Sequence, residues 1–157
     1  MQQFDRHIDV TEAAGLGQRA HIAVTITLPD HGILGPCPVV CFAKPGGGYS
    51  RGYYTHVLPG PGDGAQARWH AERGWIFISV DHLGVGDSSL HPGATLDFVT
   101  LARAAHAAEQ ELTEDLRSGS LVEGYPSVPD MIRIGIGQSM GGCMTIVQQG
   151  RYHDYDG

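Results

Sequence analysis

A serine in a glycine-flanked turn is the residue of this sequence best suited to nucleophilic chemistry. Residues 137–141 read GQSMG and match the pattern G-x-S-x-G, between an apolar stretch at 131–136 and a helix-compatible stretch at 140–149. A sharp strand-to-helix turn lifts the serine hydroxyl clear of the backbone, and small residues two positions either side let neighbouring chain pass close by. The pattern predicts Ser139 as a nucleophile. It also predicts the N–H of Met140, at the start of the helix, as one donor of an oxyanion hole.

A glycine-rich loop earlier in the chain is suited to supply the second oxyanion donor. Residues 46–48 (GGG) directly follow an apolar run at 38–43. Backbone N–H groups of glycines can approach a developing oxyanion without a Cβ in the way. We expect the Gly47 N–H to donate, with Gly48 as the alternative. Tyr49 and the next two tyrosines of the chain either line a pocket for the substrate or pack beneath the loop.

These two segments need a scaffold that brings them together, and the hydrophobic pattern predicts one. Short continuous apolar runs indicate strands buried on both faces. The expected buried strands are 38–43, 75–80 and 131–136, and the expected helices are 65–73, 95–116 and 140–149. Alternating residues at 21–28 and, more weakly, at 4–10 predict a hairpin. The order predicts one α/β domain over residues 1–157, with a mostly parallel, doubly wound sheet and helices on both faces.

The longest expected helix has a predicted cap and a predicted apolar face. Thr95 is the expected N-cap residue. Apolar residues recur at three- and four-residue steps, at Leu101, Ala105, Ala108, Leu112 and Leu116, which predicts a buried stripe. The helix after the serine is expected to end at Gly150. The polar tail at 151–157 is expected to be solvated and without clear structure.

Together these segments resemble the α/β-hydrolase superfamily of serine esterases and lipases. The matching pieces are PVVCFAKPGGGYSRGYY from residue 38, FISVDHLGVGDSS from residue 77 and IRIGIGQSMGG from residue 132. The resemblance spans roughly residues 20–150 and implies an oxyanion loop after the third strand and a nucleophile elbow after the fifth. It implies that the loop with Asp81 and His82 shapes a turn rather than catalysing. The chain departs from the family's common His-Gly start of the oxyanion loop, with KPG at 44–46.

The resemblance also implies two catalytic residues that are not found after the serine. Serine needs a histidine base oriented by a carboxylate, and in this family the order along the chain is Ser, Asp or Glu, His. Eighteen residues follow Ser139, and the helix takes most of them. We expect the chain to be the truncated N-terminal part of a longer hydrolase, inactive alone. A C-terminal segment or a second chain would supply the acid, the histidine and the next strand. Without that strand, the strand before Ser139 is expected to be an open edge.

The activity expected of the complete enzyme is hydrolysis of an ester-type bond in a small molecule (carboxylic ester, thioester or lactone) through an acyl-enzyme. No cofactor and no metal are expected. One alternative is a non-catalytic binding or scaffold module on the same fold. Another is a nucleotide-binding protein, because two segments begin a G-x-G-x-x-G pattern, but Met140 and Ser89 replace the third glycine. A P-loop is excluded because the single lysine, Lys44, precedes the glycines.

The composition argues against several other classes. The 157 residues include 23 glycines, and 10 Lys+Arg against 17 Asp+Glu give a formal net charge of -7. An acidic chain without a basic stripe is not expected to bind nucleic acid or an anionic membrane. No signal peptide and no apolar run of the ~18 residues that a membrane span needs is visible, so a cytoplasmic protein is expected.

The cysteines and the remaining histidines carry no predicted chemistry. Cys37, Cys41 and Cys143 form an odd set without a CxxC motif. They are expected to be unpaired, buried small hydrophobic residues, with the first two in one strand. His70 and His106 fall in expected helices and are expected to be solvated or packed rather than catalytic.

Overall fold

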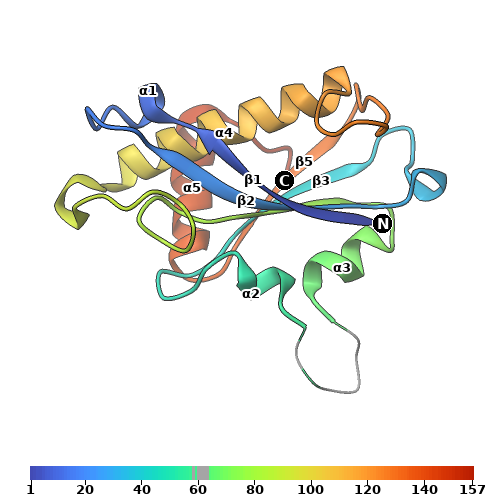
Figure 1. Cartoon of the computed structure of the whole chain (residues 1–157), viewed down its shortest axis with the longest axis horizontal. Helices are drawn as coiled ribbons and strands as arrows, with labels where there is room; N and C mark the ends of the chain where they lie inside the picture. Colours follow the sequence, from blue (N-terminus) through green and yellow to red (C-terminus); the bar gives the residue numbers. More distant parts are fainter. Residues whose placement is uncertain (58, 60–63) are drawn as a thin grey trace.

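A computed structural model of the chain describes residues 1–57, 59 and 64–157. It contains a five-stranded sheet in the order β1-β2-β4-β3-β5, with helices on both faces (Figure 1). The strands are β1 (Gln2–Asp9), β2 (His21–Leu28), β3 (Val39–Lys44), β4 (Ile76–Val80) and β5 (Ile132–Gly137). The helices are α1 (Thr11–Ala14), α2 (Gly52–Thr55), α3 (Gln66–Ala71), α4 (Phe98–Ser118) and α5 (Met140–Tyr152). Two short 3₁₀ turns lie at His31–Ile33 and Gly93–Thr95.

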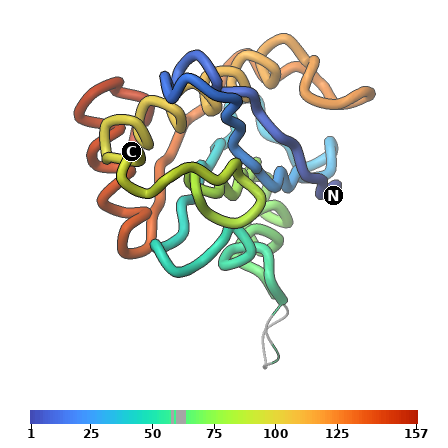
Figure 2. Tube along the Cα trace, turned by 60° about the vertical axis from the view of Figure 1, so that its left-hand side comes forward, coloured from blue at the N-terminus to red at the C-terminus, as the bar shows by residue number. Residues whose placement is uncertain are grey.

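The sheet is mixed, and its parallel half carries the glycine loop and the serine. Strands β1 and β2 form the predicted antiparallel hairpin, in register from Gln2 opposite Leu28 to Asp9 opposite His21. Strand β2 is antiparallel to β4, whereas β3 is parallel to both β4 and β5. Parallel neighbours end at one edge of a sheet, so the loops that follow β3, β4 and β5 meet there. Figures 1 and 2 both show the loop after β3, the loop after β4 and the start of α5 at one end of the molecule.

Two apolar layers hold the helices on the sheet. The larger core lies between one face of the sheet and α1, α4 and α5. The smaller core lies on the other face, where α2 and α3 cover β3 and β4; its buried residues are Cys41, Ala43, Tyr54, Ala67 and Phe77. The expected doubly wound arrangement is therefore present. None of the helices in the described part of the chain has the length and hydropathy that crossing a membrane requires.

Helix α4 has the predicted apolar face but a different start. All five residues of the predicted stripe are buried. The helix begins at Phe98, and its cap is Asp97, whose carboxylate accepts a hydrogen bond from the Thr100 N–H at 2.7 Å. The predicted cap, Thr95, is wrong, because that residue closes the 3₁₀ turn two residues earlier. A carboxylate at the N-terminus is favoured by both the free N–H groups and the helix dipole.

Strand β5 is an open edge rather than the buried strand that its apolar sequence suggested. None of its residues is buried, and Ile132 is 44% exposed, because β5 pairs with β3 on one side only. On the other side the Gly135 N–H donates to the Gly157 carbonyl oxygen at 3.1 Å, and the Asp156 N–H donates to the Arg133 carbonyl oxygen at 2.8 Å. The expectation of an open edge beside Ser139 is thus met, with the last residues of the chain laid along part of it.

The C-terminal residues are more ordered than their polarity predicted. Helix α5 continues through Gly150 to Tyr152 and ends where His153 adopts a left-handed conformation, with φ 54°. Asp154 and Tyr155 are buried. The prediction of a solvated tail is therefore wrong for Asp154 and Tyr155, because these side chains find buried hydrogen-bond partners on α4 and α5, which a local reading of polarity does not reveal.

The prediction that the cysteines are unpaired is confirmed for all three, and the prediction that they are buried is confirmed for Cys41 alone. Cys41 is buried in β3, and burial raises the pKa of its thiol to about 12. Cys37 and Cys143 are exposed, and all three thiols are free. Cys37 lies in the loop before β3 rather than in the strand, and Cys143 lies on an exposed position of α5.

Candidate active site

The turn between β5 and α5 has the geometry of a nucleophile elbow. Ser139 has φ 52° and ψ -117°, a backbone conformation that residues other than glycine rarely adopt. It is exposed and directly precedes the first residue of α5. Its hydroxyl does not cap the helix, so it stands clear of the backbone at the end of the sheet where the other two loops meet.

The glycines around Ser139 are required by close backbone contacts. A Cβ on Gly137 would overlap the backbone of Gly141 and Gly142, and a Cβ on Gly141 would overlap the carbonyl groups of Lys44 and Pro45. The Gln138 N–H donates to the Lys44 carbonyl oxygen at 3.1 Å and joins the elbow to the end of β3. The small residues of the motif therefore let three backbone segments meet beneath the serine.

The glycine-rich loop lies against this elbow. A Cβ on Gly46 would overlap the Gln138 side-chain amide and lie 3.4 Å from Ser139 Cβ, and a Cβ on Gly47 would lie 3.0 Å from Met140 Sδ. Gly48 has open space around it. Among the residues that the structure describes, the N–H groups of Met140, Gly47 and Gly48 have no hydrogen-bond acceptor. Of the two loop glycines predicted as donors, Gly47 lies nearer the elbow.

The third requirement of serine chemistry, a base, is not met by the part of the chain that the structure describes. The Ser139 hydroxyl has no hydrogen bond to any of these residues. The histidine and carboxylate of the loop after β4 are engaged elsewhere: His82 Nε2 lies 2.9 Å from the Pro45 carbonyl oxygen, and the Asp81 carboxylate binds Arg51.

Solved structures with a similar fold place this geometry in a known architecture. A probable hydrolytic enzyme from Pseudomonas aeruginosa matches with a TM-score of 0.67 and 19% identity, over 97% of this chain and 38% of its own. An α/β hydrolase from Novosphingobium aromaticivorans matches with a TM-score of 0.61 and 14% identity, over 96% of this chain and 40% of its own. An esterase from Exiguobacterium antarcticum matches with a TM-score of 0.57 and 17% identity, over 88% and 39%. This chain has the α/β-hydrolase fold.

The α/β-hydrolase fold is established here by structure alone. No protein-family model and no curated protein matches the sequence. The chain spans about 40% or less of the length of these similar structures. Its strands β3, β4 and β5, with the loops that follow them, make up the parallel part of the fold that carries the elbow.

Behind the turn that carries Ser139 lies a buried charge cluster that the sequence did not predict. Lys44, at the end of β3, is fully buried, and its Nζ lies 2.5 Å from Glu109 Oε1 and 2.6 Å from the Tyr155 hydroxyl. The Tyr155 hydroxyl donates to Glu109 Oε2 at 2.7 Å, and burial raises the pKa of Tyr155, so it is a neutral donor. Gln148 Nε2 donates to both Glu109 and Asp154. The signals that could have found it were a lysine ending an apolar run and a glutamate on the apolar face of α4.

Of the three tyrosines after the glycine loop, one packs beneath the loop and two line a cavity. Tyr54 is buried beneath the loop, where its hydroxyl donates to the Lys44 carbonyl oxygen at 2.9 Å and burial raises its pKa to about 12. Tyr49 is 56% exposed, and its ring centroid lies 5.5 Å from that of Tyr53. Both line a cavity of about 690 Å³, together with His56 and Gln66 among others.

The strained backbone of Ser139 gives a first testable prediction. Ser139→Gly should raise the free energy of unfolding by about 1 kcal/mol, because glycine adopts this conformation without strain, whereas a residue with a Cβ pays ~1–3 kcal/mol for it. Ser139→Ala keeps the Cβ and should not gain stability. Urea unfolding of both variants checks this, and equal stability of the two would show that Ser139 is not strained.

Proposed function

We propose that this chain is the N-terminal portion of a serine hydrolase that cleaves an ester-type bond in a small molecule. The bond would be a carboxylic ester, a thioester or a lactone. The observation that carries the proposal is exposed Ser139 on a strained turn next to Met140 and the glycine loop, where the N–H groups of Met140 and Gly47 have no acceptor among the described residues. The name of one similar structure, an esterase, supports this class of bond.

The proposed reaction uses these groups in two steps. Ser139 Oγ attacks the carbonyl carbon and its proton passes to a histidine base, while the N–H groups of Met140 and Gly47 stabilise the negative oxygen of the tetrahedral intermediate. The intermediate collapses to the acyl-enzyme, and the histidine returns the proton to the leaving alcohol or thiol. Water, activated by the same histidine, then releases the acid. Tyr49, in the cavity next to the glycine loop, would contact the substrate.

The catalytic acid and histidine, in this proposal, come from a C-terminal segment or a second chain that also extends the sheet. The support is the open edge of β5, where the Asp156 and Gly157 backbone groups already pair with the strand that leads to Ser139. An unpaired strand edge recruits further chain. The exposed free thiols of Cys37 and Cys143 support a reducing compartment, the cytoplasm.

Covalent labelling tests the proposed function. The polypeptide encoded by the whole gene should react with a fluorophosphonate probe, with the added mass at Ser139, and Ser139→Ala should abolish the labelling. Residues 1–157 alone should label far more slowly, because the base is missing. Intact-protein and peptide mass spectrometry measure the labelling of the wild-type polypeptide, of Ser139→Ala and of residues 1–157.

A second candidate is a binding or scaffold module on the same fold. It is favoured by the Ser139 hydroxyl having no hydrogen bond to a base within the described ranges. The same experiment separates the two candidates: a whole-gene polypeptide that folds but does not label at Ser139 would contradict the hydrolase and favour the binding role.

A further inference from the structure

The glycine loop is held at both ends by two adjacent residues of the loop after β4. Asp81 and His82 directly follow β4, and both are buried. His82 contacts Pro45, at the start of the glycine loop, and Asp81 contacts Arg51, at its end. The proposed oxyanion donor, Gly47, lies between these two anchor points.

The first anchor orients the start of the loop. His82 Nε2 lies 2.9 Å from the Pro45 carbonyl oxygen, so this nitrogen carries the proton and donates. Burial lowers the pKa of His82, which favours the neutral ring. Because a trans peptide directs its C=O and N–H to opposite sides, fixing the Pro45 carbonyl also fixes the direction of the Gly46 N–H.

The turn that follows orients the donor itself. The Tyr49 N–H donates to the Gly46 carbonyl oxygen at 3.0 Å and closes a tight turn over residues 46–49. The same peptide unit carries the Gly47 N–H, which must point away from that carbonyl. With Gly47 packed beside Met140, the plane of this peptide decides whether the Gly47 N–H faces the elbow.

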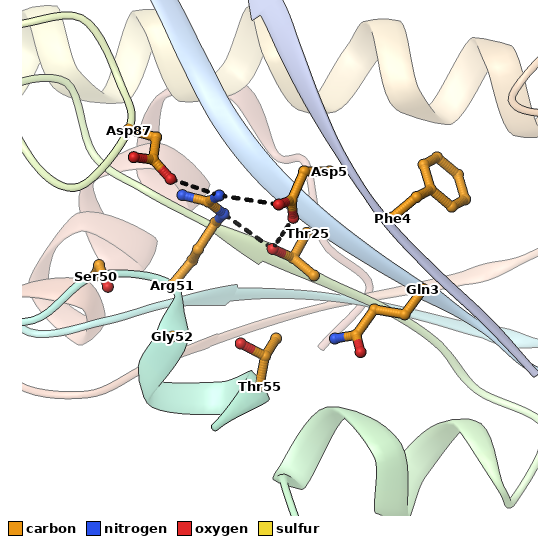
Figure 3. A pocket seen from close by; sticks show the side chains of 9 residues that line it. All are labelled: Gln3, Phe4, Asp5, Thr25, Ser50, Arg51, Gly52, Thr55 and Asp87. Carbon is orange, nitrogen blue, oxygen red and sulfur yellow. Dashed lines mark hydrogen bonds and ion pairs between the residues drawn. The ribbon is translucent and has the colours of Figure 1, made fainter. Parts of the chain in front are cut away.

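The second anchor is an arginine enclosed by acids. Asp81 accepts the Arg51 backbone N–H and pairs with the Arg51 guanidinium, each at 2.5 Å. Figure 3 shows that guanidinium between Asp87 and Asp5, at the wall of a polar cavity. Its Nε donates to Thr25 Oγ1 at 2.9 Å. A Cβ on Gly86 would overlap the Asp81 carboxylate, so the loop is shaped to hold this group.

We infer that Asp81 and His82 are positioning residues that hold the loop 45–51 at both ends so that the Gly47 N–H faces Ser139 before substrate binds. The inference rests on the proposed function for its catalytic meaning. Its structural part, the dependence of the loop conformation on His82, does not rest on the proposed function. An oxyanion donor works because its direction is set in advance, and misplacement by about 1 Å can cost roughly 100-fold in rate.

Substitutions at His82 test the inference in the whole-gene polypeptide. His82→Leu removes the donor, and His82→Gln keeps an N–H that can reach the Pro45 carbonyl. Amide hydrogen exchange of residues 46–51 should become about tenfold faster in His82→Leu, in line with the loss of one buried hydrogen bond, and stay near the wild-type rate in His82→Gln. For hydrolysis of p-nitrophenyl acetate, kcat should fall about 10- to 100-fold in His82→Leu with KM within about twofold, and His82→Gln should restore most of it.

A matched control and an independent measurement keep the test decisive. His70 Nδ1 also lies near a carbonyl oxygen, that of Gln66 at 2.8 Å, and His70→Leu should change neither the exchange of residues 46–51 nor kcat. If His82→Leu does not fold, the tautomer of the wild-type ring decides: ¹⁵N NMR should find the proton on Nε2 from pH 6 to 8.

The outcomes separate the inference from the proposed function. Unchanged exchange and unchanged kcat in His82→Leu, or a ring protonated on Nδ1 alone, would overturn the positioning role. A loss of thermal stability without any change in the exchange of residues 46–51 would overturn it too. A wild-type polypeptide without esterase activity would sink the proposed function, while faster loop exchange in His82→Leu would still support the anchor.

Discussion

Lys44→Met should lower the free energy of unfolding by about 3–5 kcal/mol, because it leaves Glu109 as an unpaired charge in the core. Lys44 and Glu109 have side chains 0% and 2% exposed, and their charged atoms lie 2.5 Å apart. Neither side chain can reach solvent when its partner is removed. The Tyr155 hydroxyl, which donates to the same carboxylate, cannot replace a full positive charge. Urea unfolding followed by circular dichroism measures the loss.

A double-mutant cycle and an exposed pair serve as controls for this prediction. Adding Glu109→Gln to Lys44→Met should recover part of the loss, because the uncompensated charge is gone. Arg68→Met removes a partner of Glu72 from a half-exposed pair, with Arg68 in α3 and Glu72 directly after it, and should lower the free energy of unfolding by less than about 1 kcal/mol. If Lys44→Met lowers the free energy of unfolding no more than Arg68→Met does, Lys44 and Glu109 do not form a desolvated ion pair.

Gly141→Ala should lower the free energy of unfolding by about 3 kcal/mol and abolish labelling of Ser139 by the fluorophosphonate probe. The added methyl group would overlap the carbonyl groups of Lys44 and Pro45. These are backbone atoms at the end of a central strand, which cannot move aside as a flexible side chain can, so the cost lies at the upper end of the usual range for overpacking. The first turn of α5 would shift away from β3, and the Met140 N–H would shift with it.

A glycine in the same helix provides the matched control. Gly150 also lies within α5, but apart from its chain neighbours and the backbone of its own helix, no described atom lies within 4 Å of the place its Cβ would take. Gly150→Ala should therefore raise the free energy of unfolding by up to about 1 kcal/mol, through helix propensity alone, and leave labelling unchanged. If Gly141→Ala were as stable as Gly150→Ala, the close approach of β3 and α5 would be wrong.

The parts of the site that could be predicted from sequence are those that depend on near neighbours along the chain. The elbow needs a strand, a turn that only small residues permit and a helix, all within residues 131–149. The hairpin of β1 and β2 and the buried face of α4 follow from local hydrophobic periodicity. The α4 cap was misplaced for a local reason as well, since Thr95 and Asp97 are both acceptable caps two residues apart.

The parts that could not be predicted depend on contacts between distant segments. The Lys44–Glu109 pair joins residues 65 positions apart, and the Lys44–Tyr155 contact joins residues 111 apart. Asp154 and Tyr155 were expected in solvent, because a polar side chain in a tail carries no sign of the partner that will bury it. The exposure of β5 depends on which strands lie beside it, so it was expected from the resemblance and not from the apolar residues of the strand itself.

Sequence alone therefore determined the α/β class, the nucleophile candidate and the glycine loop, because turns, caps and periodicity act over a few residues. Only the tertiary structure decided how the loop is held. The side chains of Asp81 and His82 reach Arg51 and Pro45 because the parallel pairing of β3 and β4 brings their following loops to one edge of the sheet. Such contacts arise from strand order and register, which no local pattern encodes.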